Sequence, residues 1–345
     1  MSKWPFLPPL TPMEARVRTE LPEPPGWAYE PKWDGFRALA WAPSKRDAQR
    51  LDSRNQRPLL RYFPELAPAL DSLPAGAVVD GEVLVVIDGR TDFDALQQRL
   101  HPADSRVQKL ARSTPAQLVA FDLLAIDGQD LRGLPFSERR TRLAGVAEQL
   151  SPHWHLTPST EDAVEAQRWF HEFESAGCDG IVAKKLERPY LEGERAMVKV
   201  KHRRTVDCVI GGYRVHKEGD RIGSLLLGLY DERDQLHFIG HCSGFPDAHR
   251  VALLKKVQPL EAPEGFGEDA RRPGSPSRWS ADKDLSWTPL RPELVCEISY
   301  DQLTGDRFRH ATRFERWRPD KDPRDCRLDQ LERPEGPAFD EVVIS

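Results

Sequence analysis

The sequence predicts an α+β protein with two domains: an N-terminal domain of antiparallel sheets with helices, residues 1–205, and a C-terminal small β-barrel, residues 206–345. The length of 345 residues suits two domains of about 150 residues each. Thirty prolines and a low mean hydropathy favour a strand-rich, loop-rich protein over a helical bundle. Near Thr205 the pattern changes from long strand runs mixed with helices to short strands separated by turns.

The elements of the first domain follow from periodicity and turn signals. The proline-rich residues 1–25 predict an extended arm on the surface. Helices are predicted over Glu138 to Leu150 and over Ala163 to Ala176, where Gly177 supplies a normal helix stop. Strands are predicted over Trp27 to Ala40, Ala77 to Ile87, Leu118 to Ile126, Ile181 to Lys184 and Met197 to Lys201.

The second domain is predicted from its short apolar runs. A helix is expected over Asp247 to Val257, a long exposed loop over Pro263 to Asp284, and a hinge near Arg203 to Asp207. Strands are predicted over 206–215, 223–231, 235–245 and 294–301. Several short strands with one helix fit a small closed barrel.

Composition limits the classes of function. The net charge is −5 and neither half is basic overall, so any contact with a nucleic acid must come from local clusters of Lys and Arg. Five scattered cysteines form no CxxC pair, which is typical of reduced thiols in the cytoplasm. The apolar runs are too short to span a membrane, and prolines break the one at the N-terminus.

The sharpest local signal is Lys32, within the segment Glu30-Pro31-Lys32-Trp33-Asp34-Gly35-Phe36-Arg37. A lysine followed by Asp34-Gly35 can lie in a tight turn that faces a cleft, and its neutral amine can attack the α-phosphate of a nucleotide. The reference pKa of lysine is about 10.4, so nearby cations are expected to depress the pKa of Lys32. The segment alone leaves open a surface hairpin with a charged tip.

A second lysine cluster lies in Met197-Val198-Lys199-Val200-Lys201. Residues two apart on a strand point to one face, so Lys199 and Lys201 share a face while the valines pack on the core. Two neighbouring ammonium groups repel each other unless an anion such as a triphosphate lies between them. The bland alternative is an edge strand protected by lysines.

Two acidic segments complete the set. Asp80-Gly81-Glu82 interrupts a valine-rich run, and Asp179-Gly180 opens a run that ends at Lys184. Two carboxylates that converge near phosphates suit Mg²⁺, which takes few protein ligands and keeps its waters. The alternative for each Asp-Gly pair is a hairpin turn.

These segments, in this order, resemble the covalent nucleotidyltransferases: ATP-dependent DNA ligases, RNA ligases and mRNA capping enzymes. Ser53-Arg54-Asn55 matches their arginine segment and Phe121-Asp122 their aromatic segment. Arg313 to Lys321 looks like the last ligase motif, which lies on an oligonucleotide-binding barrel. The chain from about Leu10 to Leu331 is similar to bacterial ligases of the ligase C type and to the ligase domain of ligase D.

The resemblance implies a nucleotidyltransferase (adenylation) domain over 1–205 and an OB-fold barrel over 206–345. It implies an ATP-dependent DNA ligase that seals 3′-hydroxyl/5′-phosphate nicks through a lysyl-AMP and a DNA-adenylate, in DNA repair. The implied cofactors are ATP and Mg²⁺ or Mn²⁺. The implied partner is nicked duplex DNA, contacted by a cytoplasmic monomer whose barrel rotates about the hinge, with protein partners unknown.

Residue roles follow from the matched positions. Lys32 is expected to carry AMP, Arg37 to contact the ribose, and Phe121 and Val182 to enclose adenine. Arg54 is expected to grip the 5′-phosphate of the nick, and the barrel residues to orient pyrophosphate. The catalytic set is Lys32, Asp34, Lys199 and Lys201; the nucleotide-binding set is Glu30, Pro31, Arg37, Arg54, Glu82, Phe121, Val182, Lys184, Arg318, Asp320 and Lys321; the metal set is Glu82 and Asp179.

The sequence departs from the family pattern at Asp179, where a Glu is usual, and this leaves open whether the shorter side chain reaches a metal directly or through a water. Met197 also replaces a frequent aromatic residue. Candidate DNA contacts are Arg307, Arg309, Arg313 and Arg316, with Arg271, Arg272 and Arg278 in the long loop; the alternative for that loop is a solvated segment.

Two other functions compete with DNA ligation. An RNA ligase or a capping guanylyltransferase shares the core chemistry, but the ending Arg313 to Lys321 favours DNA. A non-catalytic nucleic-acid-binding protein with a degenerate transferase domain is disfavoured, because Lys32, Glu82 and the two clustered lysines are all present.

Overall fold

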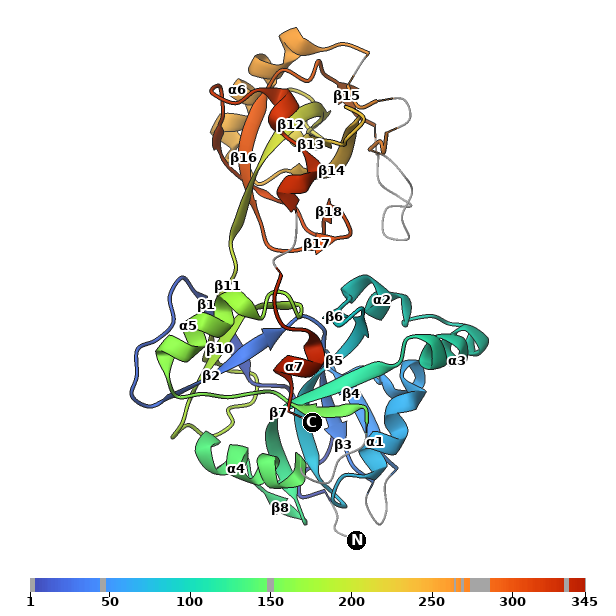
Figure 1. The fold of residues 1–345 in the computed structure, drawn as a ribbon, viewed down its shortest axis with the longest axis vertical. Helices are drawn as coiled ribbons and strands as arrows, with labels where there is room; N and C mark the ends of the chain where they lie inside the picture. Colours follow the sequence, from blue (N-terminus) through green and yellow to red (C-terminus); the bar gives the residue numbers. More distant parts are fainter. Residues whose placement is uncertain are drawn as a thin grey trace. The chain divides into compact units, whose positions relative to one another are not determined.

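The computed structural model describes residues 4–43, 48–147, 152–263, 265–267, 270–273, 286–331 and 335–344. The chain forms two compact units (Figure 1). The first comprises Met1–His202 with Arg333–Ser345, and the second comprises Arg203–Glu332. The chain thus leaves the first unit within the segment expected as the hinge. The second unit also differs from the expected range of 206–345, because the last residues of the chain, Arg333–Ser345, belong to the first unit.

The first unit is built on two sheets. One has the strand order β1-β11-β10-β2, with β1 parallel to β11 and the other pairs antiparallel. The other has the order β4-β3-β5-β7-β8, with β6 paired to β5 and β9 parallel to β7. Their bounds are β1 Glu14–Arg18, β2 Trp27–Trp33, β3 Phe36–Trp41, β4 Arg50–Ser53, β5 Val78–Ile87, β6 Arg90–Thr91, β7 Ala116–Ile126, β8 Gln129–Asp130, β9 Trp154–Leu156, β10 Cys178–Lys185 and β11 Arg195–Lys201.

Helices cover these sheets (Figure 1). α5 begins after Asp162, whose side chain accepts a hydrogen bond from the Val164 amide, and it buries Ala166 and Trp169 against the first sheet. It ends at Glu172, earlier than predicted. The bounds are α1 Ala67–Asp71, α2 Phe93–Gln98, α3 Asp104–Ser113, α4 Phe136–Ala147, α5 Ala163–Glu172 and α7 Phe339–Val342, with short 3₁₀ turns at Leu60–Tyr62 and Pro64–Leu66.

The chain crosses from one sheet to the other between β2 and β3, at Asp34 and Gly35. A Cβ on Gly35 would lie 2.3 Å from the carbonyl oxygen of Val83, so only glycine lets the backbone pass this close to β5. The crossover places Lys32, the penultimate residue of β2, at the joint between the two sheets.

The second unit is a barrel of antiparallel strands in the order β14-β13-β12-β16-β19. A bridge between Cys242 and Thr312 links β14 to the residues just before β19. Leu225, Ile239 and Ile298 are fully buried in its core. The bounds are β12 Arg204–Val215, β13 Ile222–Tyr230, β14 Leu236–Cys242, α6 Asp247–Val257, β15 Thr288–Pro289, β16 Val295–Tyr300, β17 Leu303–Thr304, β18 Arg307–Phe308 and β19 Arg313–Trp317, with 3₁₀ turns at Gln258–Leu260, Pro323–Asp325 and Leu328–Leu331.

The α+β fold class is therefore confirmed, and one local expectation is wrong. Glu14–Arg18 is not part of a surface arm but strand β1, whose backbone pairs with β11. Leu10 and Met13, just before it, are buried. The proline-rich composition concealed a strand because paired backbone and buried neighbours outweigh local propensity.

No helix in the part of the chain that the structure describes is both long and apolar enough to cross a membrane.

Candidate active site

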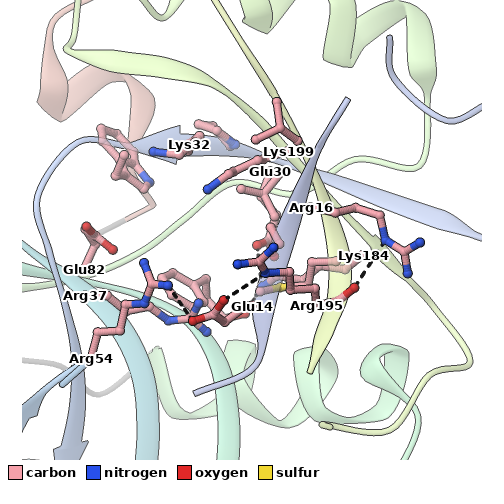
Figure 2. Close-up of a pocket in the computed structure, with 17 residues that line it drawn as sticks. Glu14, Arg16, Glu30, Lys32, Arg37, Arg54, Glu82, Lys184, Arg195 and Lys199 are labelled. Carbon is pink, nitrogen blue, oxygen red and sulfur yellow. Dashed lines mark hydrogen bonds and ion pairs between the residues drawn. The ribbon is translucent and has the colours of Figure 1, made fainter. Parts of the chain in front are cut away.

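A cavity of about 600 Å³ lies between the two sheets of the first unit (Figure 2). The first sheet contributes β1, β2, β10 and β11, and the second contributes β3, β5 and β7. Ten residues expected at the nucleotide line it: Glu30, Pro31, Lys32, Arg37, Arg54, Glu82, Phe121, Val182, Lys184 and Lys199. Residues 90 or more positions apart in sequence therefore meet here, because the sheets bring their strand positions together.

Lys32 is held by Asp179. Its Nζ lies 2.7 Å from Oδ1 of Asp179, and Nζ of Lys201 lies 3.1 Å from Oδ2 of the same carboxylate. Asp179 belongs to β10 and precedes a bulge at Gly180, where φ is +149° and a Cβ would lie 2.0 Å from the Val200 carbonyl oxygen. The Asp-Gly pair is thus part of a strand, and the hairpin-turn alternative is wrong for it.

The ionic state of this cluster differs from the expectation. Burial alone would lower the pKa of Lys32, but the Asp179 carboxylate outweighs it, so the pKa of Lys32 is raised. Burial, Lys32 and Lys201 lower the pKa of Lys199. Burial opposes the charge on Asp179, yet Lys32 and Lys201 keep the pKa of its carboxyl below the usual value. Among the protein groups around it, Lys32 is therefore held as a charged amine, and the predicted depression of its pKa, which depended on a bound Mg²⁺ as well as on other lysines, stays a prediction.

The paired lysines lie on a central strand. β11 is flanked by β1 on one side and by β10 on the other, so the edge-strand alternative is wrong. Val198 and Val200 are buried, as the alternation predicted. Lys199 lines the cavity and Lys201 contacts Asp179, so both ammonium groups lie on the face of β11 that carries the Lys32–Asp179 pair.

The far end of the cavity carries a buried carboxylate and an aromatic ring. Glu30 is 2% exposed, and its Oε2 lies 2.7 Å from Nζ of Lys184. Lys184 also donates to the Phe121 carbonyl oxygen at 2.9 Å and lies 4.6 Å from the centre of the Phe121 ring. Burial raises the pKa of Glu30, and Lys184 and Arg140 only partly oppose this. Oε1 of Glu30 makes no hydrogen bond among the described residues and lies 3.6 Å from Nη1 of Arg140, so it can accept from a ligand N–H.

Arg37 is locked by residues that the sequence did not single out for this role. Its Nε and Nη2 donate to the two oxygens of Asp80 at 3.0 and 2.6 Å, and the Tyr190 hydroxyl donates to Asp80 at 2.6 Å. Burial would lower the pKa of Arg37, but Asp80 raises it. The guanidinium lies 5.3 Å from the centre of the Phe121 ring. Asp80 was noticed only as a neighbour of Glu82, and no pattern in the sequence marks Tyr190.

Glu82 fits a divalent cation, and Asp179 does so less well. Burial raises the pKa of Glu82 to about 8, although Lys32 and Arg37 pull it down. Burial disfavours the negative charge of this carboxyl, and a bound cation would offset that cost. Both oxygens of Asp179 are already engaged by ammonium groups. The described residues contain no group of three or more His, Cys, Asp or Glu side chains placed to hold a metal.

The mouth of the cavity is lined by charged residues of β1 that the sequence analysis missed. Nη2 of Arg54 lies 2.5 Å from Oε1 of Glu14, and Arg54 holds the pKa of that carboxyl below its usual value (Figure 2). Arg16 and Arg195 line the same cavity. Alternating charged and apolar residues over 14–18 were the signal that could have revealed them.

Three residues that line the first cavity also line a second cavity of about 890 Å³. Arg37, Arg54 and Glu82 line both, so the two cavities share one wall. The second cavity adds Arg57 and Arg61, together with apolar surface from Phe36, Pro58, Leu59, Tyr62 and Leu100. Its mixture of guanidinium groups and apolar side chains matches the phosphates and sugars of a polynucleotide.

The predicted barrel residues form their own cluster in the second unit. Nη1 of Arg318 donates to both oxygens of Asp207 at 2.9 Å, and Nη2 lies 2.8 Å from Oδ2 of Asp320. Arg318 lowers the pKa of Asp320 to about 2. The Lys321 amide donates to the Arg318 carbonyl oxygen. Asp207 was predicted as a hinge residue, not as the partner of Arg318.

The candidate DNA-contacting arginines of the barrel are mostly paired on its surface. Arg316 contacts Glu297 at 2.6 Å, Arg271 contacts Asp306, and Arg309 donates to Gln302. The Arg313 side chain is 76% exposed. Arg278 lies outside the described residues.

A two-sheet unit around a lysine-lined cavity, followed by a small barrel, is the architecture of nucleotidyltransferases. Residues 10–201 match the model of the ATP-dependent DNA ligase domain, and residues 218–321 match that of the ATP-dependent DNA ligase C-terminal region. The chain belongs to the ATP-dependent DNA ligase family.

Individual relatives agree with this assignment. The chain is 50% identical to DNA ligase C2 of Mycolicibacterium smegmatis, over 96% of each chain. It is 49% identical to DNA ligase C of Mycobacterium tuberculosis, over 98% of each. A solved Lig E DNA ligase, 16% identical, has the same fold with a TM-score of 0.57, covering 89% of this chain and 99% of that one.

Proposed function

We propose that this ATP-dependent DNA ligase seals 3′-hydroxyl/5′-phosphate nicks in duplex DNA and carries AMP on Lys32. The observation that carries the proposal is the position of Lys32. Its amine lies in the cavity beside Lys199 and is paired with the same carboxylate as Lys201. The cavity has the size of a nucleotide site and combines a ring with a few convergent polar groups.

The residues that line the cavity suit ATP bound in one orientation. Adenine would stack on Phe121, with Val182 against its other face and Oε1 of Glu30 accepting a hydrogen bond from an N–H of the base. The phosphates would then extend toward Lys199 and Lys201, whose mutual repulsion an anion relieves. Arg37, fixed by Asp80, would meet the ribose.

In the first step the Lys32 amine attacks the α-phosphorus, a nitrogen–phosphorus bond forms, and pyrophosphate leaves. The amine must first lose its proton, which the ion pair with Asp179 opposes. A divalent cation bound at Glu82 would supply positive charge that lowers the pKa of Lys32 and neutralises the phosphates. Asp179 would join that site through a water, because its oxygens serve the lysines. Positioning and charge neutralisation supply most of the catalysis of phosphoryl transfer.

In the second step AMP passes to the 5′-phosphate of the nick, and in the third the 3′-hydroxyl attacks that phosphate and AMP leaves. Arg54, at the wall shared by the two cavities, is placed to hold the 5′-phosphate. Arg57 and Arg61 in the second cavity are candidates for neighbouring phosphates. Such contacts are independent of sequence and sensitive to salt.

The barrel has two tasks in this scheme. Arg318, Asp320 and Lys321 would orient pyrophosphate during the first step, and the arginines of the barrel would later contact DNA. One arrangement cannot serve both, so rotation near Arg203 to Asp207 is part of the proposal. We further propose that the protein acts in DNA repair as a cytoplasmic monomer, where its five buried, unpaired cysteines stay reduced.

The test is intact mass spectrometry before and after incubation with ATP. The protein is expected to gain one AMP and to lose it when pyrophosphate is added. Lys32→Ala and Lys32→Arg should both gain nothing, and Lys32→Arg is the matched control because it keeps a cation beside Asp179. Covalent AMP on Lys32→Ala would show that the nucleophile is another residue. Labelling by GTP alone would identify a capping-type enzyme, and sealing of nicked RNA but not nicked DNA would identify an RNA ligase.

A further inference from the structure

The last described residues, 335–344, return to the first unit after the barrel is complete, and we call them the C-terminal tail. α7 of the tail lies among elements of the first unit (Figure 1). Phe339, Val342 and Val343 are 1%, 4% and 8% exposed, so the tail is buried like core, although its sequence is far from that core. Neither the nucleotide site nor the barrel accounts for it.

Backbone and side-chain bonds hold the tail in place along its length. The Ser175 hydroxyl donates to the Pro337 carbonyl oxygen at 2.7 Å, and the Phe339 amide donates to the Gly89 carbonyl oxygen at 2.6 Å. Leu156 and Ile344 exchange two backbone hydrogen bonds of 2.8 and 2.9 Å. A segment bonded at both ends and buried between them has a defined position.

The C-terminal tail packs against both sheets where they meet. Its apolar side chains form one cluster with Trp33 of β2 and Cys178 of β10 from the first sheet, and with Leu84 of β5 and Val119 of β7 from the second. The rings of Phe339 and Trp33 meet edge to face with centres 5.4 Å apart. Trp33 is fixed from another side, because its Nε1 donates to Oγ1 of Thr157 at 2.9 Å.

Two residues of this cluster adjoin the reacting group in sequence. Trp33 follows Lys32, and Cys178 precedes Asp179, and the two are register partners across β2 and β10. Successive side chains of a strand point to opposite faces. The tail packs against Trp33 and Cys178, and Trp33, which itself lines the cavity, connects the tail to the site of Lys32.

We propose that the C-terminal tail is a positioning element of the active site. Phe339 fixes Trp33, and Trp33 fixes the strand position from which Lys32 reaches the α-phosphorus. The inference rests on the proposed role of Lys32 as the nucleophile. It adds that a residue beyond the barrel sets the geometry of a reaction at residue 32. An error of about 1 Å in such a geometry can cost about 100-fold in rate.

A merely structural tail would lower stability without changing the chemistry of the folded enzyme. A positioning tail lowers the rate of AMP transfer at saturating ATP and leaves ATP binding nearly unchanged, because none of the tail residues lines the cavity. The two roles are therefore separated by kcat against KM for the first step, measured beside the melting temperature.

The experiment uses the full chain with Phe339→Ala, the conservative Phe339→Leu and the matched control Leu70→Ala. Leu70 of α1 is fully buried in a different core cluster, so its truncation should cost comparable stability. Single-turnover AMP transfer is followed by intact mass at a temperature where each variant is folded. We expect Phe339→Ala to slow transfer at least tenfold with KM for ATP within about twofold, Phe339→Leu to restore most of the rate, and Leu70→Ala to stay within about twofold of the parent.

A double-mutant cycle tests the route through Trp33. The double variant Phe339→Ala with Trp33→Leu should be no slower than the slower single variant, because both substitutions remove the same contact, that between the Phe339 and Trp33 rings. Full additivity of the two effects, or a parental rate in Phe339→Ala, overturns the proposal. Should Phe339→Ala not fold, Val342→Ala decides, because Val342 belongs to the same cluster: a rate unchanged relative to the parent while its melting temperature falls also overturns the proposal. A parent chain that accepts no AMP would instead refute the proposed function.

Discussion

The two units of this ligase carry their charges in different ways. In the first unit, arginine and carboxylate are buried together: the side chains of Arg139 and Asp122 are 0% and 1% exposed, and those of Arg99 and Glu65 are 0% and 8% exposed. In the barrel, Arg316 is 62% exposed while it contacts Glu297. Both kinds of pair have short distances, so distance alone does not distinguish them.

The difference teaches which charges can change partners. A buried charge that loses its partner cannot turn to water, so these two buried pairs of the first unit behave as fixed parts of a template. A surface ion pair stabilises the folded protein by only about 0–1 kcal/mol, and salt screens its attraction. The barrel arginines can therefore exchange a carboxylate for a DNA phosphate at little cost, whereas the first unit holds its groups ready for one nucleotide geometry.

The largest expected effect is on the buried pair. Arg139 of α4 donates to both oxygens of Asp122 at 2.8 and 2.9 Å and also to the Leu134 carbonyl oxygen. Arg139→Ala should lower the free energy of unfolding by about 3–5 kcal/mol, because Asp122 stays buried without its partner. Urea unfolding measures this. The double variant Arg139→Met with Asp122→Leu should recover much of the loss, and a loss under about 1 kcal/mol in Arg139→Ala would contradict the template view.

The next effect depends on pH. The pKa of Glu82 is about 8 in the folded protein, against 4.5 for an unperturbed Glu, so the folded state holds a proton that the unfolded state releases between these values. The free energy of unfolding should therefore fall as the pH rises from about 4.5 to about 8, and Glu82→Gln should remove this part of the fall. Unfolding at pH 5, 6.5 and 8 without divalent cations should show the variant gaining on the parent with rising pH. A constant difference would show that Glu82 titrates normally.

The smallest effect is expected in the barrel. Arg316→Ala should change the free energy of unfolding by no more than about 0.5 kcal/mol, because its pair with Glu297 is exposed. Its affinity for nicked DNA should fall at low salt, and the slope of log affinity against log salt should decrease by about one, if the guanidinium neutralises one phosphate. Binding measured at several salt concentrations checks this, with Lys217→Ala as the matched control for loss of one exposed cation. An unchanged slope would remove Arg316 from the DNA face.

Much of the fold could be predicted because its strands are long and well marked. α6 spans the predicted Asp247–Val257, and β5, β7 and β11 lie within one or two residues of the predicted runs. β1 was missed because proline-rich flanks and charged residues hide a strand whose stability comes from pairing with β11. α1 and α2 were missed because short helices among turn residues carry little periodic signal, whereas the amphipathic pattern of α3 was overlooked.

The site residues were predictable in part for the same reason. Ten cavity-lining residues stand in short motifs and were therefore predicted from the sequence, whereas Glu14, Arg16 and Arg195, which also line the cavity, were not. The residues that fix the side chains of the site do not stand in such motifs. Asp80, which binds Arg37, lies 43 positions from it in the sequence. Tyr190, which binds Asp80, lies a further 110 positions along the chain. The ion pair of Lys32 with Asp179 also required coordinates, since its strength depends on burial and distance.

The return of the chain to its first unit has a consequence for synthesis on the ribosome. Everything from Trp33 to Val119 of the sheet joint is translated early, but Phe339 is added only after the whole barrel. At about 5–20 residues per second, the roughly 220 residues between Val119 and Phe339 take about 11–44 s to appear. During that interval the strand that bears Lys32 lacks its contact with Phe339. If the C-terminal tail positions Lys32 as proposed, a nascent chain would complete this site only after the barrel has been synthesised.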